Sequence, residues 1–537
     1  MYTARPARWR LPLAVLIVGM FMSILDVSIV NVAIPTIQKD FGATTEDIQW
    51  IATAYSLALG VVVPVSGWLG DRFGLGRTYL TSLLGFAFGS ALCGLAWDLN
   101  SMVVFRIIQA IAGGILPVVT MTMVYRIVPR QQIGAAMGMY GLGIVFAPAI
   151  GPTLGGYLVE YLNWRLIFFI NVPVGILGFV AALLVLPAFP AIGGGRFDIV
   201  GFLAIGSGLF ALLLALSKGQ DWGWTGYRVL ILLTYSGLAL AAFVVIELET
   251  AQPLLDVRVF RYWPFTNSLL IIAVLSVGLF AVLFYMPLML QQTRDLGAFD
   301  TGLVLLPQAL VMGVMMPIAG QLYDRIGPRW PAVLGLSIVA AGTYLLHTIT
   351  LDTSREHIMG LLAFRAVGMG LAMMPIMTGG LSIIPQSLVS RASAFNNVVQ
   401  RCSAALGLAV LTALLTRQQA QQMTDRSALI PRDVTPPRVG PPGTPPVVGQ
   451  YLMYQELMRR VFVAAIDDLF LVTAAFTLVA VALALALRSR LAQWLGRVGA
   501  PAGPREREHD AWQTPHADIP EPRRSVEESS GRDVHHR

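Results

Sequence analysis

Asp26 is the ionisable residue whose surroundings most clearly predict chemistry. It lies within an apolar run that extends from Leu11 to Pro35. A carboxylate near the middle of a membrane-spanning helix costs about 2.5–3.5 kcal/mol on insertion scales, so it normally faces a polar cavity or a partner. Arg106, in the fourth apolar run, is predicted at a similar depth from the same side. We therefore expect Asp26 and Arg106 to approach each other.

This pair could carry a proton. Burial disfavours the charged form of a carboxylate, whereas a nearby cation favours it. A carboxylate poised between these two effects can take up a proton on one side of a membrane and release it on the other. The residues thus predict a proton-coupling pair, Asp26 and Arg106. The alternative is a static buried ion pair that fixes helix packing.

A charged loop motif occurs twice, with Gly, Asp, Arg and Gly at the same offsets. The first copy contains Gly67, Asp71, Arg72, Gly74 and Arg77, and the second contains Gly320, Asp324, Arg325 and Gly327. A Phe-Arg pair follows each copy, at Phe105-Arg106 and Phe364-Arg365, so the chain contains a duplicated bundle. Each Asp could meet the dipole of a neighbouring helix N-terminus, and each Arg the opposite bundle or lipid headgroups. We expect conformational latches, with ordinary charged turns as the alternative.

Two further groups of residues suit close helix packing and a cavity between helices. Small residues and prolines allow close packing and bending of the fifth apolar run, although packing alone is the alternative. Those predicted to form this motif are Gly151, Pro152, Gly155 and Gly156. Methionines and aromatic residues are frequent in the second half, where flexible side chains suit a promiscuous cavity or simply a core. The residues predicted to line a substrate cavity are Asn31, Tyr285, Arg365 and Asn397.

The elements that must position these residues are membrane helices. Of 537 residues, 56% are hydrophobic and only 12% are charged, against about a quarter in a soluble domain. Apolar runs of roughly 20 residues, each long enough to cross a bilayer, recur about fourteen times. We expect an all-α polytopic membrane protein with spans near 11–35, 49–70, 78–97, 101–125, 133–158, 166–187, 199–217, 229–247, 265–290, 300–320, 331–349, 356–377, 392–416 and 467–489.

The duplicated motif divides the chain into two six-helix bundles with two helices inserted between them. The predicted parts are a stub at 1–10, the first bundle at 11–187, the inserted helices at 188–264, the second bundle at 265–489 and a disordered tail at 490–537. Prolines and glycines within 417–466 predict an extended or disordered loop outside the membrane. Arginines are concentrated in the short loops on the side of both termini, which places both termini in the cytoplasm.

Other function classes lack the residues they need. The two lysines, Lys39 and Lys218, are not part of a phosphate-binding loop, so no nucleotide motor is predicted. Cys93 and Cys402 lie in apolar runs, and no metal-ligand cluster, cofactor motif or catalytic cluster is evident. The net charge of +7 is placed in short loops, which favours lipid headgroups over nucleic acid. We expect a non-enzymatic protein that uses an ion gradient, the substrate's own gradient or a separate subunit.

Several of these strings resemble those of the fourteen-helix drug:proton antiporter family (EmrB/QacA type) of the major facilitator superfamily. They are Leu25-Asp26 through Pro35, the loop from Gly67 to Arg77, Phe105-Arg106 with Gln109, Gly151 to Gly156, Asn163-Trp164-Arg165, Asn171-Val172-Pro173 and Pro253 to Asp256. The resemblance implies alternating access, with export of small amphipathic drugs in exchange for protons across a bacterial inner membrane, and hence antibiotic resistance.

One departure bears on the substrate. Some similar proteins that export divalent cationic drugs carry an extra acid in the thirteenth span, which here is 392–416 and contains Arg401 and no acid. We therefore expect neutral, zwitterionic or monocationic substrates. Two alternatives remain at this point: an exporter of an endogenous lipid or cell-envelope metabolite, and a proton-coupled nutrient symporter. The sequence makes no prediction about a periplasmic adaptor.

Overall fold

The computed structural model describes residues 9–428, apart from 192, 194 and 295, and residues 446–487. Within these ranges the chain is built from helices and contains no strand. The predicted stub at 1–10 lies almost wholly outside the described residues, as do the middle of the predicted loop and the predicted tail at 490–537.

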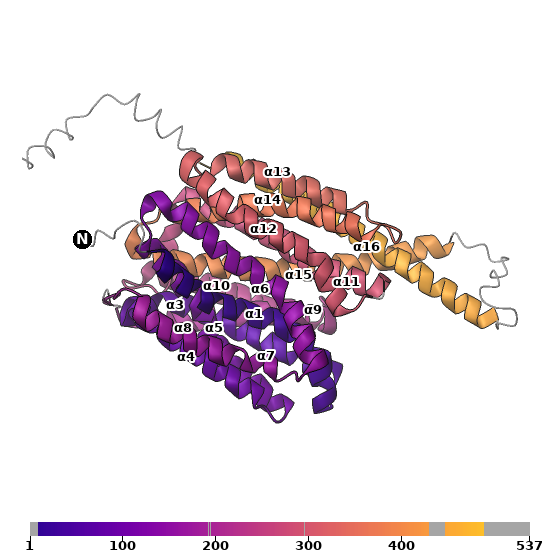
Figure 1. Ribbon diagram of the computed structural model, residues 1–537, viewed down its shortest axis with the longest axis horizontal. Coiled ribbons are helices and arrows are strands. Elements are labelled where there is room, and N and C mark those ends of the chain that lie inside the picture. The colour runs from indigo at the N-terminus through magenta and orange to yellow at the C-terminus, as the bar shows by residue number, and fades with distance from the viewer. Residues whose placement is uncertain (1–8, 192, 194, 295, 429–445, 488–537) are drawn as a thin grey trace, which may run out of the picture. The chain divides into compact units, whose positions relative to one another are not determined.

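The helices follow the predicted spans one for one (Figure 1). The first half contains α1 (Arg10–Phe41), α2 (Thr45–Ile48), α3 (Trp50–Phe73), α4 (Leu75–Gly94), α5 (Leu99–Ile127), α6 (Ile133–Tyr161), α7 (Leu166–Phe169) and α8 (Asn171–Val185). Next come α9 (Ile199–Trp222) and α10 (Tyr227–Glu249). The second half contains α11 (Trp263–Arg294), α12 (Ala298–Ile326), α13 (Arg329–Leu346), α14 (Arg355–Leu381), α15 (Val389–Ala428) and α16 (Pro446–Leu485).

Thirteen helical segments in the described ranges are long and apolar enough to cross a membrane, with α7 and α8 forming one segment. The remaining long helix, α4, has 20 residues and begins with polar ones that include Arg77, Thr78 and Thr81. It packs against α5 and α8 as part of the same bundle. The predicted all-α polytopic fold is therefore confirmed.

Two predicted boundaries are wrong. Helix α1 continues through Pro35 to Phe41, so Asp26 lies at the middle of the helix. The stretch 417–466 was expected to be extended, yet α15 runs on to Ala428 and α16 begins at Pro446. The prolines of this stretch cluster within 431–446, and both flanks are rich in helix-forming residues. Proline is also tolerated in the first helical turn, where α16 starts.

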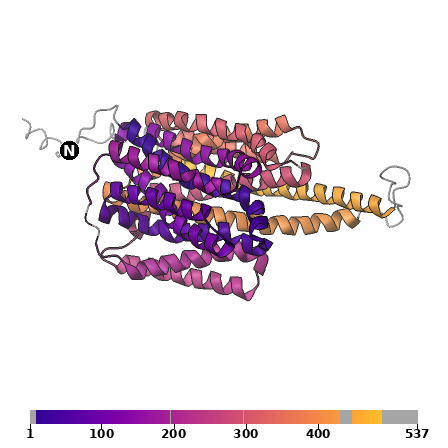
Figure 2. The ribbon, with the colours of Figure 1, turned by 60° about the horizontal axis from the view of Figure 1, so that its bottom comes forward.

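The two halves meet along α6 with α12 and along α3 with α15. The inserted helices lie at the edge of the bundle, at the bottom of Figure 2, where α9 packs on α3 and α15. Helix α10 packs mainly on α9, and only 17% of its most apolar 18-residue stretch is buried. Such an apolar and uncovered helix suits contact with lipid.

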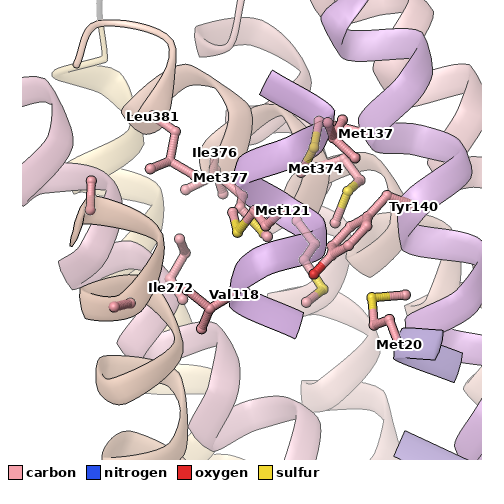
Figure 3. Close-up of a cluster of buried hydrophobic side chains, with 14 of the residues drawn as sticks. Met20, Val118, Met121, Met137, Tyr140, Ile272, Met374, Ile376, Met377 and Leu381 are labelled. Carbon is pink, nitrogen blue, oxygen red and sulfur yellow. The ribbon is translucent and has the colours of Figure 1, made fainter. Parts of the chain in front are cut away.

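The contact between the halves is rich in methionine. Figure 3 shows Met121 of α5 beside Met377 of α14, and Met374 of α14 beside Met137 and Tyr140 of α6. These side chains belong to a hydrophobic cluster that includes residues of both halves. Because methionine is flexible and polarizable, such a contact can repack without losing much of its burial.

Candidate functional site

Asp26 and Arg106 form a fully buried ion pair, as predicted. The Arg106 Nη1 lies 2.5 Å from Asp26 Oδ2, and the two residues are 1% and 0% exposed. Asp26 comes from the middle of α1 and Arg106 from the first third of α5. Helix α5 starts with a capping box in which the Asp98 side chain accepts from the Ser101 N–H at 2.8 Å. Hydrogen bonding by Ser101 lowers the pKa of Asp98, which strengthens this start.

Amide side chains complete the shell around Asp26. Gln109 donates to Asp26 Oδ1 at 2.8 Å and accepts from Arg106 at 2.7 Å. Asn171, at the start of α8, also donates to Oδ1, at 3.3 Å. Ser90 of α4 accepts from Gln109 at 2.6 Å. The carboxylate therefore has donors on both oxygens, which is what a buried charge requires.

An aromatic ring covers the cation. The Arg106 guanidinium lies 3.8 Å from the centroid of the Tyr55 ring of α3, a cation–π distance. Arg106 Nε also donates to the Ile51 carbonyl at 3.5 Å. Gln109, Asn171 and Tyr55 were not predicted as site residues. Gln109 follows Arg106 by one helical turn, which is a signal for a shared face, whereas Asn171 and Tyr55 arrive from distant helices.

Arg365 occupies the corresponding place in the second half but has different partners. It is 1% exposed, donates from Nε to Thr343 Oγ1 at 2.9 Å and donates from Nη2 to the Gly278 carbonyl at 2.6 Å. No carboxylate pairs with it among the described residues. Arg365 is thus tied into the helix packing of its own half and does not point to a substrate cavity.

The Asp of the second loop motif meets a helix N-terminus, as predicted. Asp324 accepts from the backbone N–H groups of Gly134 and Ala135, both at 3.0 Å, in the first turn of α6. The free N–H groups and the dipole of a helix N-terminus both favour a carboxylate there. We call this contact between α12 and α6 the second latch.

The Asp of the first motif reaches the start of α15. Ser390 donates to Asp71 at 3.1 Å, and Arg126 of α5 lies 3.5 Å from the same carboxylate. We call this contact the first latch. Both latches join one half to the other at the end of the bundle that carries the duplicated loops, which we call the motif end.

The remaining motif residues divide into turn-formers and exposed cations. Gly74 and Gly327 follow the last residues of α3 and α12 with φ of 86° and 83°, a backbone region that glycine adopts without strain. The cations of the motif, Arg72, Arg77 and Arg325, are exposed. Their positions at the motif end are compatible with the predicted lipid headgroups, and that role stays a prediction.

A second part of the repeat was missed. Helices α6 and α15, which receive the two Asp side chains, each follow a proline and a short 3₁₀ turn, at Pro129 and Pro385. Gly134 and Ser390 are each the second residue of their helix. The spacing from Asp71 to Pro129 is nearly the same as that from Asp324 to Pro385. This repeated spacing is the sequence signal that could have revealed the second part of the repeat.

The small-residue motif packs α6 on α1 next to the ion pair. A Cβ on Gly151 would lie 2.5 Å from Ser28 Oγ, and one on Gly155 would lie 3.1 Å from the Ile29 carbonyl. Ser28 donates to the Pro148 carbonyl at 3.2 Å. Gly156 has nothing within 4 Å of such a Cβ, so close packing does not explain that residue.

The four predicted cavity residues do not form one site. Asn31 is exposed, Asn397 donates to the Ser393 carbonyl, and Tyr285 is buried with its hydroxyl 2.8 Å from Thr412 Oγ1. Instead, a small apolar pocket lies between α11, α14 and α15. Its lining residues are Ile272, Leu275, Ser276, Leu279, Met369, Met373, Met377 and Gln400.

One acidic position also escaped prediction. Asp467 was placed at the end of a span, but the longer α16 puts it within the helix. It is half-buried, and its Oδ1 has no hydrogen-bond partner among the described residues.

Together, the fold and the buried ion pair define a polytopic membrane transporter. Residues 16–408 match the model of the Major Facilitator Superfamily, and the chain belongs to that family. As a member of a transporter family, it is not an enzyme.

Similar proteins agree with this assignment. The chain is 36% identical to the uncharacterized MFS-type transporter YhcA of Bacillus subtilis (strain 168) over 78% of this chain and 79% of that protein. It is 31% identical to the tetracenomycin C resistance and export protein of Streptomyces glaucescens over 88% and 90%. Other bacterial relatives, named for multidrug resistance, multidrug transport or lincomycin resistance, are 29% to 33% identical. The solved structure of the proton:xylose symporter XylE has a TM-score of 0.56 at 12% identity, covering 89% of this chain and 95% of that one.

Proposed function

We propose that this chain is a proton-coupled multidrug efflux antiporter that exports small, mostly amphipathic drugs by alternating access. The observation that carries the proposal is the buried Asp26–Arg106 pair at the middle of a membrane helix. Intramembrane carboxylates with a cationic partner are characteristic of proton pathways. The resistance and export names of several relatives support an outward direction of transport.

The neutral partners of Asp26 make its protonation feasible. When Asp26 takes a proton it loses an ion pair, but Gln109 and Asn171 can still hydrogen-bond to the neutral acid. Arg106 keeps Gln109 and the Tyr55 ring as partners. In both protonation states these side chains therefore keep a hydrogen-bond or ring partner. This limits the free-energy cost of protonating Asp26.

Helix α6 provides a mechanical link from the ion pair to the second latch. Gly151 and Gly155 of α6 pack closely against Ser28 and Ile29 of α1, which lie near Asp26 in the sequence. The first turn of α6, roughly 25 Å away at 1.5 Å per residue, is bound by Asp324. In this hypothesis protonation of Asp26 from outside favours substrate release, and deprotonation toward the cytoplasm resets the pump. A change in the α1–α5 contact would tilt α6 and strain the latch, with Pro152 as a bend.

We assign the motif end to the cytoplasm, with both termini on that side of the bacterial inner membrane, because arginine is concentrated there. With both latches formed, the present conformation is then closed toward the cytoplasm. The two latches hold this state and break when the pump opens inward.

The first test is drug uptake into everted membrane vesicles, with and without an acid-inside pH gradient. A panel of fluorescent drugs is compared for the wild type, Asp26→Asn and the control Asp300→Asn, which changes an exposed acid at the start of α12. We expect gradient-dependent uptake that Asp26→Asn abolishes and Asp300→Asn retains.

Two results would overturn the proposal. Uptake that persists in Asp26→Asn removes Asp26 from the coupling. Wild-type protein that is correctly inserted but moves no drug points to an endogenous lipid or cell-envelope metabolite, and gradient-driven movement in the opposite direction points to a symporter.

A further inference from the structure

Arg401 is a cation at the contact between the halves that lacks a partner. It lies in α15, is only partly exposed, and its Nε is buried without a hydrogen-bond partner. Within the described ranges it forms no ion pair. Helix α15 packs against α3 and α5 of the first half, the helices that carry Tyr55 and Arg106. Arg401 thus belongs to the helix of the second half that packs on two helices of the ion-pair site.

The fully buried cations of the described bundle, Arg106, Arg365 and Lys218, are matched. Arg106 has Asp26, Arg365 has Thr343 and the Gly278 carbonyl, and Lys218 has Asp221 at 3.1 Å. A charged group taken out of water is stable only when it is paired or fully hydrogen-bonded. Arg401 differs from these three, because its Nε has no hydrogen-bond partner among the described residues.

An apolar surface lies directly beside it. Gln400, the preceding residue of α15, lines the pocket between α11, α14 and α15. Met369, Met373 and Met377 follow one another at one-turn intervals of α14 and present one face to that pocket. Flexible thioether side chains can adapt to aromatic or aliphatic groups of different shape. A cation of α15 thus lies next in sequence to a residue that borders a deformable apolar wall formed by α14.

We propose that Arg401 binds the anionic group of an exported amphipathic molecule, while the methionine pocket takes its apolar part. The ligand class is the organic monoanion, such as an aryl carboxylate. A guanidinium is suited to it, since its planar array of donors matches a carboxylate. The inference rests on the proposed export function and names a substrate class for it, beyond the neutral, zwitterionic or monocationic substrates expected from the sequence of the span 392–416.

The test is equilibrium binding to the purified full chain, without any gradient. The probes are radiolabelled 1-naphthaleneacetate and its uncharged amide, which share one ring system. The variants are Arg401→Gln, Arg401→Lys and the control Arg355→Gln, an exposed arginine at the start of α14. We expect Arg401→Gln to lower the affinity for the acetate about tenfold or more, as for loss of a charged hydrogen bond, and to leave the affinity for the amide unchanged. Arg401→Lys should retain much of the acetate affinity and Arg355→Gln all of it.

Equal wild-type affinity for the two probes would overturn the proposal, as would an equal loss of both in Arg401→Gln. If Arg401→Gln does not fold, the acetate-to-amide affinity ratio in wild type and Arg401→Lys decides. The export proposal fails separately: Arg401-dependent anion binding without any gradient-driven export refutes antiport alone. If Arg401→Gln still exports anionic and neutral compounds as the wild type does, the anion site is refuted and the export function is not.

Discussion

The two halves of the chain treat the same buried arginine differently. Arg106 and Arg365 follow the two loop motifs at corresponding places, and both are 1% exposed. The first is paired with a carboxylate that also binds two amides, whereas the second binds a hydroxyl and a backbone carbonyl. Only the arginine of the first half therefore has a partner whose charge can change. Both copies of the repeat thus contain the buried arginine, and only the first pairs it with an ionisable acid among the described residues.

The latches are unequal as well. Asp324 accepts two backbone N–H groups, while Asp71 accepts one hydroxyl and lies near one arginine. A Cβ on Gly320 would collide with the Gly134 carbonyl, but one on Gly67 would meet Ser390 at an ordinary 3.4 Å. The contact between α12 and α6 is thus the more closely fitted of the two.

The largest contrast is expected between Arg106→Gln and Arg365→Gln. The first breaks a buried ion pair, a loss of about 3–5 kcal/mol in typical cases, and leaves Asp26 without its cation. Drug export should fall to background in Arg106→Gln and persist in Arg365→Gln. Export assays in everted vesicles, with expression and gel-filtration profiles as controls, make this comparison. Equal loss in both variants would mean that the arginines have one shared structural role.

Thermal unfolding in detergent gives the other side of that contrast. Arg365→Gln removes donors from Thr343 and the Gly278 carbonyl, at an expected cost of about 1–3 kcal/mol. The unfolding midpoint should fall even though export continues. An unchanged midpoint would show that these two hydrogen bonds contribute little to stability.

The next contrast concerns the glycines of the two latches. Gly320→Ala should separate α12 from α6 at the motif end, because the new methyl group meets backbone that cannot rotate away. Gly67→Ala should be tolerated. The accessibility of a single cysteine at Ala135 to a membrane-impermeant thiol reagent, in everted vesicles of a background without native cysteines, should rise in Gly320→Ala alone. Unchanged accessibility in both variants would count against a closely fitted second latch.

The aspartates of the latches should differ by less. Asp324→Asn loses the charge that binds the start of α6, worth about 0.3–1 kcal/mol for a charge at a helix end. The open population at the motif end should rise by up to about fivefold, measured by the same labelling. Asp71→Asn should have a smaller effect, since its main bond comes from a hydroxyl. A larger effect of Asp71→Asn would reverse the ranking of the latches.

The smallest effect is expected outside the latches. Asp256, which precedes the second half, lies 4.0 Å from Arg391 at the start of α15, and the Arg391 side chain is 27% exposed. Such a partly exposed pair contributes about 0–1 kcal/mol. Asp256→Asn should leave both labelling and export within about twofold of wild type. A strong effect would mean that the segment before α11 forms a third functional contact at the motif end, beside the two latches.

Much of this arrangement follows from local sequence. The length of the apolar runs predicts fourteen helices. Because the rise per helical residue is fixed, the positions of Asp26 and Arg106 along their runs predict that they lie at similar depth in the membrane. The dipole argument brought Asp324 to a helix N-terminus. By contrast, Tyr55 and Asn171 reach the ion pair through tertiary packing of α3 and α8, which no local pattern encodes. The sequence pattern does not predict the lengths of α15 and α16. The cluster of prolines marks only the middle of the stretch 417–466, while its two flanks are helical.

The central claim is that Asp26 carries the proton that is exchanged for drug. The direct measurement is the internal pH of proteoliposomes that hold a pH-sensitive dye while an outward or inward drug gradient is imposed. Wild-type protein should move protons against the drug flux, and Asp26→Asn should move none while still binding drug. Drug-driven proton movement that continues in Asp26→Asn would contradict the account.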